Sequence, residues 1–245
     1  MYPTFLRIGD FEITSFGVLV ALGALAGMLV FQRELRRAGL PGDAINAAMA
    51  GVLGGLAGAK LIWAIEFHNT APFLDLVLSR GGLSWFGGLA GGLTAGLTTL
   101  RRYRVPLVRG LAAASPGLAL GHAIGRIGCF MVGDDYGRPS TLPWAVAFPK
   151  GLPPTDVPVH PTQLYEAIPL AVLAWLLIRW RRHNTPDVVV LARYLMLAGA
   201  IRFAVEFLRV NAVVLGPFTL AQLWSMALVV AGAALALRPG HRKSA

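Results

Sequence analysis

Residues Ile13–Phe31 read ITSFGVLVALGALAGMLVF and contain no charged residue. A helix of about 20 apolar residues is long enough to cross the hydrocarbon core of a bilayer. Similar apolar blocks recur along the chain, in which 56% of the 245 residues are hydrophobic and 14% are charged. Because an ordinary soluble domain has about a quarter charged residues, the sequence predicts a polytopic membrane protein.

The apolar blocks predict a single membrane domain over residues 1–245, with about seven transmembrane helices. Helices are expected because unpaired backbone groups are too costly in hydrocarbon. The predicted fold class is therefore an all-α integral membrane protein. The expected spans are Ile13–Phe31, Ala44–Ile65, Leu83–Leu100, Leu111–Met131, Gln163–Ile178, Val188–Phe207 and Phe218–Leu237.

Lysine and arginine residues predict the orientation of these spans. Alternate connections hold 13 and 5 basic residues, and the more basic connections are expected in the cytoplasm. The N-terminus is then outside and the C-terminus is cytoplasmic. The larger set is Arg33, Arg36, Arg37, Arg101, Arg102, Arg104, Arg109, Arg179, Arg181, Arg182, Arg238, Arg242 and Lys243, and the smaller set is Arg7, Arg80, Arg138, Lys150 and Arg209. Since these residues gather at the ends of spans, the net charge of +10 does not indicate a nucleic-acid partner.

The connection between residues 132 and 162 contains seven prolines, which disfavour a regular helix. The charge distribution places it on the extracytoplasmic side. A long irregular loop over the mouth of a membrane protein is usually a lid or a binding element. A passive solvated loop is the alternative.

Pairs of glycines four residues apart lie within the second and third spans and favour close approach of helices. We expect helix packing to account for most of them. The pairs are Gly51/Gly55, Gly54/Gly58, Gly87/Gly91 and Gly88/Gly92.

Ionisable residues inside spans are candidate site residues, because charge in hydrocarbon is costly. Lys60 and Arg193 lie near span ends and are expected to be structural. His122 and Arg126 lie four residues apart in the fourth span and therefore share a helix face. Arginine is a natural bidentate partner of phosphate, so Arg126 is a candidate for binding an anionic lipid head group.

The surroundings of this arginine allow two interpretations. Glycines at 121, 125 and 128 leave little side-chain bulk near it, so that a large head group has room to approach. Asp134 and Asp135 follow at the outer end of the span and could equally form salt bridges with the arginine.

The sixth span carries Arg202, Glu206 and Arg209 on one stripe, at intervals of four and three residues. One interpretation is an internally neutralised ion pair that joins two helices. The other is that the arginines form a second cationic side of a phosphate site, in which Glu206 fixes Arg202. Two buried arginines need more negative charge than one glutamate supplies, which favours the second interpretation.

The fifth span opens with the segment His160-Pro161-Thr162-Gln163-Leu164-Tyr165-Glu166. Structurally, Pro161 suits the start of a helix, and Thr162 is a candidate N-cap. Functionally, the segment would place hydrogen-bonding groups at head-group depth. These groups are His160, Gln163, Tyr165 and Glu166.

Taken together, these motifs resemble the prolipoprotein diacylglyceryl transferases. The run from Gly125-Arg126 through Gly133 to Gly137 is similar to the signature of the family's fourth helix, and residues 160–166 are similar to its His-Pro-Ser-Gln-Leu-Tyr-Glu stretch. Residues 199–207 resemble its Arg/Glu segment, and Gly87-Gly88-Leu89 also matches. The likeness covers nearly the whole chain.

The resemblance implies an enzyme of the bacterial cytoplasmic membrane, where it would be a multi-pass protein. Such an enzyme transfers the diacylglyceryl group of phosphatidylglycerol to the lipobox cysteine thiol of a prolipoprotein signal peptide and releases glycerol phosphate. The resemblance implies no metal and no organic cofactor. By position, Arg126 and Arg202 match the family's essential arginines. The residues expected to bind substrate are Gly87, Gly88, Gly125, Asp134, His160, Gln163, Tyr165, Glu166 and Glu206.

Several positions depart from the family pattern. Phe86 stands where the family usually has a histidine, and Cys129 replaces the signature asparagine. Further departures are Val132, Asp134, Ala198 and Phe16. One explanation is that His122 takes over as the base, because a buried imidazole can titrate near neutral pH; alternatively, it only forms a hydrogen bond between helices. The departures also allow a divergent paralogue that acts on another anionic lipid or acceptor, or a non-catalytic lipid-binding or transport protein.

Overall fold

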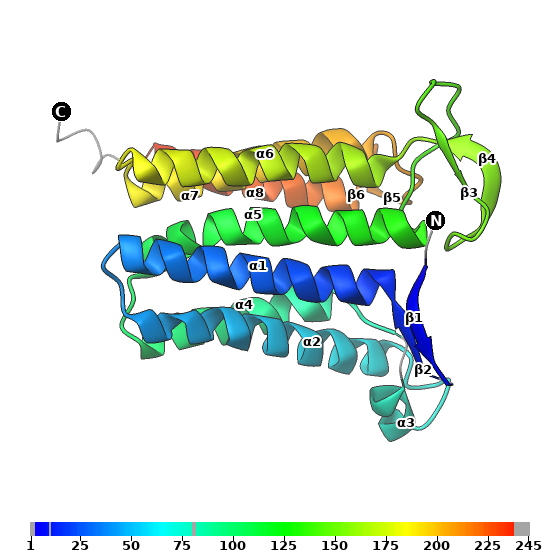
Figure 1. The fold of residues 1–245 in the computed structure, drawn as a ribbon, viewed down its shortest axis with the longest axis horizontal. Coiled ribbons are helices and arrows are strands. Elements are labelled where there is room, and N and C mark those ends of the chain that lie inside the picture. Colours follow the sequence, from blue (N-terminus) through cyan, green and yellow to red (C-terminus); the bar gives the residue numbers. More distant parts are fainter. Residues whose placement is uncertain (1–2, 10, 80–81, 238–245) are drawn as a thin grey trace. The chain divides into compact units, whose positions relative to one another are not determined.

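The computed structural model describes residues 3–9, 11–79 and 82–237, and most of them are helical. The helices are α1 (Ser15–Arg37), α2 (Asn46–Glu66), α3 (Phe73–Leu78), α4 (Trp85–Arg102), α5 (Leu107–Val132), α6 (Thr162–Arg182), α7 (Asp187–Glu206) and α8 (Leu220–Ala236), with a 3₁₀ turn η1 at Gly42–Ile45 (Figure 1). The strands are β1 (Thr4–Ile8), β2 (Phe11–Thr14), β3 (Val146–Phe148), β4 (Thr155–Val159), β5 (Val213–Leu215) and β6 (Phe218–Thr219).

The prediction of a helical membrane protein is confirmed at this level. In the described residues, five helical segments are long and apolar enough to cross a membrane: Ser15–Arg37, Gly42–Glu66, Leu107–Val132, Thr162–Arg182 and Asp187–Glu206. The shorter helices α4 and α8 overlap the remaining two predicted spans. The all-α prediction missed three antiparallel strand pairs, β1–β2, β3–β4 and β5–β6. Four basic residues used for the orientation, Arg80, Arg238, Arg242 and Lys243, lie outside the described residues.

The chain divides into two compact units, which are described separately. Unit 1 comprises Met1–Leu29 and Ser115–Ala245, and unit 2 comprises Val30–Ala114. The boundaries fall inside α1 and inside α5. The prediction of a single domain stays a prediction.

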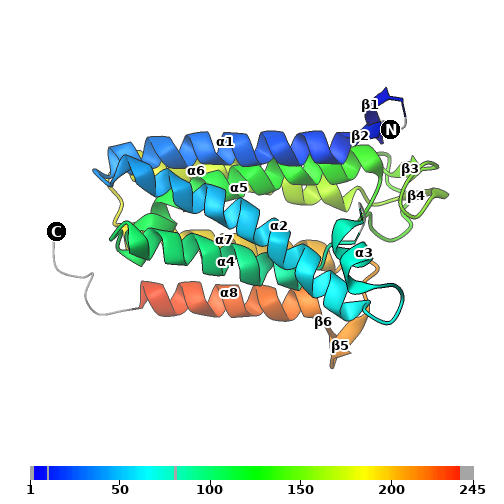
Figure 2. The ribbon, with the colours of Figure 1, turned by 90° about the horizontal axis from the view of Figure 1, so that it is seen from below.

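In unit 2, α2 and α4 lie side by side and meet through glycines (Figure 2). A Cβ atom added at Gly54 would lie 2.8 Å from the backbone oxygen of Gly91, and one at Gly58 would lie 3.0 Å from the Cα of Gly91. A side chain at either position would therefore force the helices apart, which confirms the predicted packing role of these glycines. The buried apolar core of this unit includes Phe31, Leu35, Leu40, Leu100 and Val105.

In unit 1, further glycines bring helices into backbone contact. A Cβ at Gly27 of α1 would lie 2.9 Å from the backbone oxygen of Gly117 in α5, and one at Gly199 of α7 would lie 2.8 Å from the backbone oxygen of Ser225 in α8. The turn between α6 and α7 is closed by an ion pair of 2.7 Å between Arg181 Nη1 and Asp187 Oδ1. Close packing thus fixes the relative positions of the helices that carry the ionisable residues.

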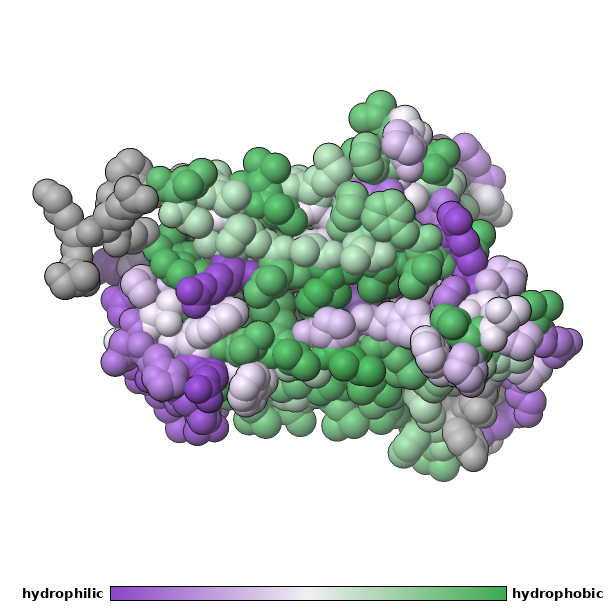
Figure 3. Space-filling model, turned by 90° about the horizontal axis from the view of Figure 1, so that it is seen from above, coloured by the Kyte–Doolittle hydropathy of each residue, from purple (hydrophilic) through white to green (hydrophobic). Residues whose placement is uncertain are grey.

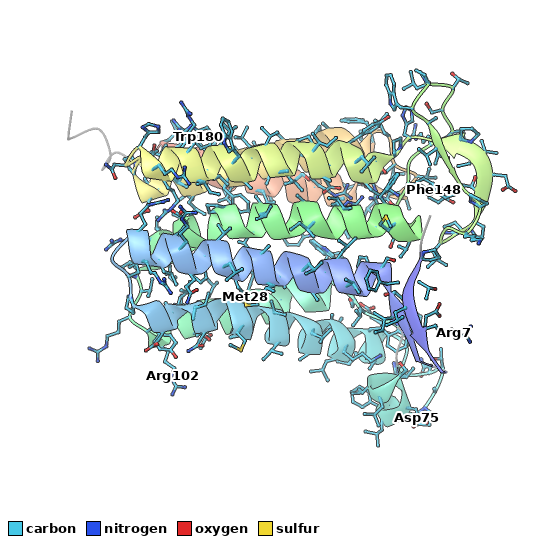
Figure 4. All side chains as sticks on the ribbon, in the orientation of Figure 1. Arg7, Met28, Asp75, Arg102, Phe148 and Trp180 are labelled. Atoms are coloured by element: carbon cyan, nitrogen blue, oxygen red, sulfur yellow. The ribbon has the colours of Figure 1, made fainter. Side chains whose placement is uncertain are left out.

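The proline-rich connection between α5 and α6 is anchored to unit 1. Phe148 of β3 is fully buried, lies edge-on to Phe130 of α5 at 5.6 Å and stacks on Tyr136 at 5.5 Å between ring centroids. The Tyr136 hydroxyl donates a hydrogen bond of 2.8 Å to the backbone oxygen of Pro153. Figure 4 places Phe148 at one end of unit 1 and Trp180 of α6 at the other. The absence of a helix agrees with the prediction, and the buried ring shows that part of the connection is packed rather than solvated; its role as a lid or binding element stays a prediction.

Large apolar side chains remain exposed along the helices, as expected of surfaces that face lipid. They include Leu22, Leu29, Val172, Trp175 and Val230. In Figure 3, hydrophobic residues cover much of the length of the face shown, and the most hydrophilic residues gather towards its ends.

Candidate active site

Arg126 lies near the C-terminal end of α5 and is 7% exposed. Its Nη1 atom donates a hydrogen bond of 2.9 Å to Oδ2 of Asp135, and its Nε atom lies 3.1 Å from Oε2 of Glu166. The sulfur of Cys129, one turn along the helix, lies 3.5 Å from the same Nη1. The arginine is therefore held from two sides by carboxylates on different segments.

Glu166, in the second turn of α6, joins three of the predicted site residues. Its Oε2 atom lies 3.1 Å from Arg126 Nε and 3.9 Å from Arg202 Nη1, and its Oε1 atom lies 3.4 Å from His122 Nε2. The carboxylate is buried, whereas the His122 side chain is 51% exposed. Side chains from α5, α6 and α7 thus converge on one carboxylate.

Glu206 fixes the arginine of α7. Its Oε2 atom lies 2.7 Å from Arg202 Nη2, the ion pair that the four-residue spacing suggested. Its Oε1 atom accepts hydrogen bonds of 2.7 Å from the Thr219 hydroxyl and from Asn211 Nδ2. Because these partners come from outside α7, they hold the carboxylate and, through it, Arg202 in one orientation.

Asp135 connects the end of α5 to the end of α7. Its Oδ1 atom accepts a hydrogen bond of 2.5 Å from Arg209 Nη2, while its Oδ2 atom is occupied by Arg126. Burial disfavours ionisation of Asp135, but the charges of Arg209 and Arg126 and their hydrogen bonds outweigh it and lower its pKa. Of the two expected acidic partners of Arg126, Asp135 is the one that forms the salt bridge. Burial raises the pKa of Asp134, whose side chain makes no ion pair within the described residues.

The cluster balances its charges internally. Three guanidinium groups, from Arg126, Arg202 and Arg209, face three carboxylates, from Asp135, Glu166 and Glu206. One glutamate is indeed too little for these arginines, and the further negative charge comes from Glu166 of α6 and from Asp135, one of the two aspartates expected as salt-bridge partners of Arg126.

Four buried guanidinium nitrogens of the cluster nevertheless lack a hydrogen-bond partner in the described part of the chain: Arg126 Nε and Nη2, Arg202 Nη1 and Arg209 Nε. Arg126 Nε and Arg209 Nε still lie 3.1 and 3.6 Å from carboxylate oxygens of Glu166 and Glu206, which leaves Arg126 Nη2 and Arg202 Nη1 as the two least satisfied donors. A buried donor without an acceptor costs about 1–3 kcal/mol. An anionic oxygen of a ligand would gain the most binding free energy by accepting hydrogen bonds from these two atoms.

The start of α6 holds the loop that carries Asp135. The Thr162 hydroxyl donates a hydrogen bond of 2.8 Å to the backbone oxygen of Asp135, and Gln163 Nε2 donates one of 2.5 Å to the backbone oxygen of Asp134. The N-cap prediction for Thr162 was wrong, because Pro161 occupies the cap position and the hydroxyl is used by the loop. The Tyr165 hydroxyl accepts a hydrogen bond of 2.6 Å from Trp144 Nε1 and lies 3.4 Å from His160 Nδ1.

The sequence model of the prolipoprotein diacylglyceryl transferases matches residues 3–238. The chain belongs to this family. The phosphatidylglycerol–prolipoprotein diacylglyceryl transferase of Geobacter sulfurreducens is 32% identical over 98% of this chain and 96% of its own length. Proteins of the same name from Methylococcus capsulatus, 30% identical over 99% and 97% of the two chains, and from Clostridium tetani, 30% identical over 85% and 86%, are also similar.

Within this transferase fold, the glycines near Arg126 differ in their surroundings. A Cβ at Gly125 would meet no atom within 4 Å, so the predicted open space exists there. At Gly121 it would lie 3.0 Å from the backbone oxygen of Gly23, and at Gly128 3.3 Å from Leu19 Cβ. The proposed room around the arginine was therefore wrong for these two glycines, which pack against α1.

Gly87 and Gly88 lie in unit 2. A Cβ at Gly87 would lie 2.7 Å from Ile62 Cβ, and one at Gly88 would lie 3.5 Å from Ala59 Cβ, so both face α2. The distance at Gly87 shows a packing role, whereas the distance at Gly88 is an ordinary contact; their expected part in substrate binding stays a prediction.

Two members of the transferase cluster were not assigned to the site from the sequence. Arg209 was noted on the stripe with Arg202 and Glu206 but was not among the expected site residues; in the structure α7 ends at Glu206, and Arg209 follows it in the next segment. Asp135 adopts a left-handed backbone conformation, with φ of 59°, that turns its carboxylate towards both arginines. Nothing in the residue pattern signals that conformation.

Proposed function

We propose that this chain transfers the diacylglyceryl group of phosphatidylglycerol to the lipobox cysteine of prolipoproteins in the bacterial cytoplasmic membrane. Its family membership and its similarity to transferases of that name over nearly their whole length support this activity. In the reaction, the thiol sulfur bonds to the glyceryl carbon that carried the phosphate. The carbon–oxygen bond of that carbon breaks, and glycerol phosphate leaves with the bonding electrons.

The unpaired nitrogens of two converging arginines carry the assignment of the site. Arg126 Nη2 and Arg202 Nη1 are buried donors on different helices, and the guanidinium groups to which they belong approach the same Glu166 carboxylate, through Arg126 Nε and Arg202 Nη1. Negative charge grows on the phosphate as the carbon–oxygen bond breaks, and fixed donors aimed at such charge lower the barrier without reorganising. Arg126 and Arg202 bind the phosphate, and Glu166 and Glu206 hold them in place.

The thiol must lose its proton before or during attack, which requires a base. His122 takes this role in our proposal, because its ring nitrogen is 3.4 Å from Glu166 and its side chain is half exposed. A thiol carried by a membrane-bound peptide can reach an exposed imidazole on the same helix face as Arg126. The competing role, a contact that only joins α5 to α6, uses the same Glu166.

We further propose that all seven long helices span the membrane, with the N-terminus outside and the C-terminus in the cytoplasm. The helices α4 and α8, with 18 and 17 residues, fall within the range of about 17–25 residues used by spanning helices. In this orientation Arg126 and Arg202 lie near the outer ends of their helices. Prolipoproteins would therefore meet the site from the outer side of the membrane.

Complementation tests the activity and the arginines together. The chain is expected to restore lipoprotein maturation in bacteria depleted of their own transferase, measured by the mass of a lipobox protein. Arg126→Ala and Arg202→Ala are each expected to lower transfer by about 10²–10³-fold, because each removes a donor to the developing charge. Arg193→Ala is the control, since this arginine of α7 stacks on Trp180 at 4.5 Å and is not part of the cluster.

The outcomes separate the two parts of this proposal. No maturation by properly inserted wild-type protein would exclude the activity, and bound phosphatidylglycerol that a lipobox peptide leaves unchanged would indicate a lipid carrier. Full activity of either cluster variant would exclude that arginine from phosphate binding.

A further inference from the structure

Asp135 differs from the other two carboxylates of the cluster in where it lies. Glu166 and Glu206 are buried on helices, with side chains that are 3% and 0% exposed, whereas the Asp135 side chain is 48% exposed on the loop after α5. Glu206 is also held by two hydrogen bonds from neighbouring segments. Asp135 is therefore the carboxylate that can leave the cluster with the least rearrangement.

Asp135 occupies one of the two Arg126 nitrogens that bidentate binding of a phosphate uses. Bidentate binding of a phosphate uses two neighbouring nitrogens of one guanidinium group. In Arg126, Nη2 is unpaired, but Nη1 donates to Asp135 Oδ2 at 2.9 Å. Nη1 also contacts the Cys129 sulfur at 3.5 Å, so a phosphate that binds both Nη atoms of Arg126 competes for Nη1 with Asp135 and with this sulfur.

The charge balance of the cluster also predicts that a bound phosphate competes with the Asp135 carboxylate. The cluster is neutral when its three carboxylates are ionised, so a phosphodiester adds an uncompensated negative charge to a partly buried site. Uncompensated charge away from water is costly. Movement of one carboxylate out to solvent restores the balance.

We propose that Asp135 is an internal competitor of the head-group phosphate: it holds Arg126 and Arg209 in the empty site and yields Arg126 when the anionic head group binds. This inference rests on the proposed function. When the reaction ends, the returning carboxylate displaces glycerol phosphate and so assists its release. Asp135 is in this sense a positioning residue that sets the affinity of the site for phosphate.

Binding of glycerol phosphate to the purified protein tests this role. Calorimetry is carried out in nanodiscs of zwitterionic lipid at fixed ionic strength, with wild type, Asp135→Asn and the control Asp156→Asn. Asp156 is an exposed carboxylate of β4 in the same unit, so its variant makes the same change in net charge. Asp135→Asn is expected to bind about 5-fold more tightly or better, which corresponds to about 1 kcal/mol, and the control is expected to match wild type.

A purely structural Asp135 predicts the opposite result. Loss of the Asp135 carboxylate would then loosen the loop after α5, disorder Arg126 and Arg209 and weaken the binding of glycerol phosphate. Unchanged or weaker binding by a folded Asp135→Asn variant would therefore overturn the proposal, as would tighter binding by Asp156→Asn to the same extent. Steady-state kinetics give a second measurement, in which Asp135→Asn is expected to show a lower KM for phosphatidylglycerol and stronger inhibition by glycerol phosphate.

Folding and activity are measured on the same preparations. If thermal unfolding shows that Asp135→Asn does not fold, Asp135→Ser is used, because this smaller neutral side chain also removes the competing carboxylate. Collapse of both variants would assign the carboxylate to the fold and overturn the competitor role. A wild-type protein without transfer activity would count against the proposed function, whereas an active wild type with unaltered binding in the variant would count against this inference alone.

Discussion

At the scale of single residues, Glu166 joins side chains of three helices in the site. Its buried carboxylate approaches Arg126, Arg202 and His122 from one position in the second turn of α6. Removing one partner of a buried ion pair leaves the other charge uncompensated, which costs about 3–5 kcal/mol. The site therefore depends on mutual support, in which each arginine is positioned by a carboxylate from another segment.

His122 is the residue whose role is tested most directly by kinetics. In the proposed mechanism His122 removes the thiol proton, so His122→Ala is expected to lower kcat by about 10²–10⁴-fold. The KM for phosphatidylglycerol is expected to change little, because the arginines remain. The measurement is the pH profile of kcat, whose acidic limb should disappear in the variant.

His183→Ala is the matched control, because this exposed histidine follows the C-terminal end of α6, next to the α6–α7 turn. A His122→Ala protein with a normal pH profile and a lower melting temperature would assign the histidine to helix packing. The base would then be sought elsewhere in the site.

At the scale of elements, the contact of α2 with α4 depends on the absence of side chains. A Cβ at Gly58 would lie 3.0 Å from Gly91 Cα and too close to the backbone oxygen of Gly87. Backbone atoms of a packed helix cannot move aside independently, so the whole helix must shift. In membranes, where helices gain little from hydrophobic burial against each other, such close approach is a main source of helix association.

We therefore expect Gly58→Ala to lower the free energy of unfolding by about 1–3 kcal/mol, the usual cost of overpacking. Gly51→Ala is the control on the same helix, because its added Cβ would lie at an ordinary 3.6 Å from the backbone oxygen of Gly92. Unfolding in mixed micelles, followed by circular dichroism, measures both. Equal stability of the two variants would show that the contact is looser than these distances imply.

At the scale of the whole molecule, the proposed orientation places the connection before α6 outside and the connection after it in the cytoplasm. In a Cys129→Ala background, Thr141→Cys and His183→Cys place single thiols at exposed positions in these connections. A membrane-impermeant thiol reagent is expected to label Thr141→Cys in intact cells and His183→Cys only after permeabilisation. The reverse labelling pattern would invert the topology, and labelling of both in intact cells would contradict an odd number of spans between them.

Much of the helical framework could be predicted from the sequence, because the bilayer imposes a simple rule on length and polarity. The apolar blocks predicted where seven long helices lie, including α4 and α8, although α5 begins at Leu107 rather than Leu111. The strand pairs were missed because segments of two to five residues carry too little periodicity to be recognised.

The candidate site was predictable where charge inside hydrocarbon is itself the signal. Arg126, Arg202 and Glu206 stand out by that cost, and the spacing of four residues correctly paired Arg202 with Glu206. The convergence on Glu166 was not predictable, because a helix pattern specifies the face of a residue but not which neighbour that face meets.

That this chain is a helical membrane protein follows from its residues alone, because length, apolarity and the placement of basic residues are properties of single segments. Which charges compensate each other depends on how the segments pack. The pairing depends on the relative positions of α5, α6 and α7 and on the left-handed turn at Asp135, and distances between segments are not encoded in any one of them.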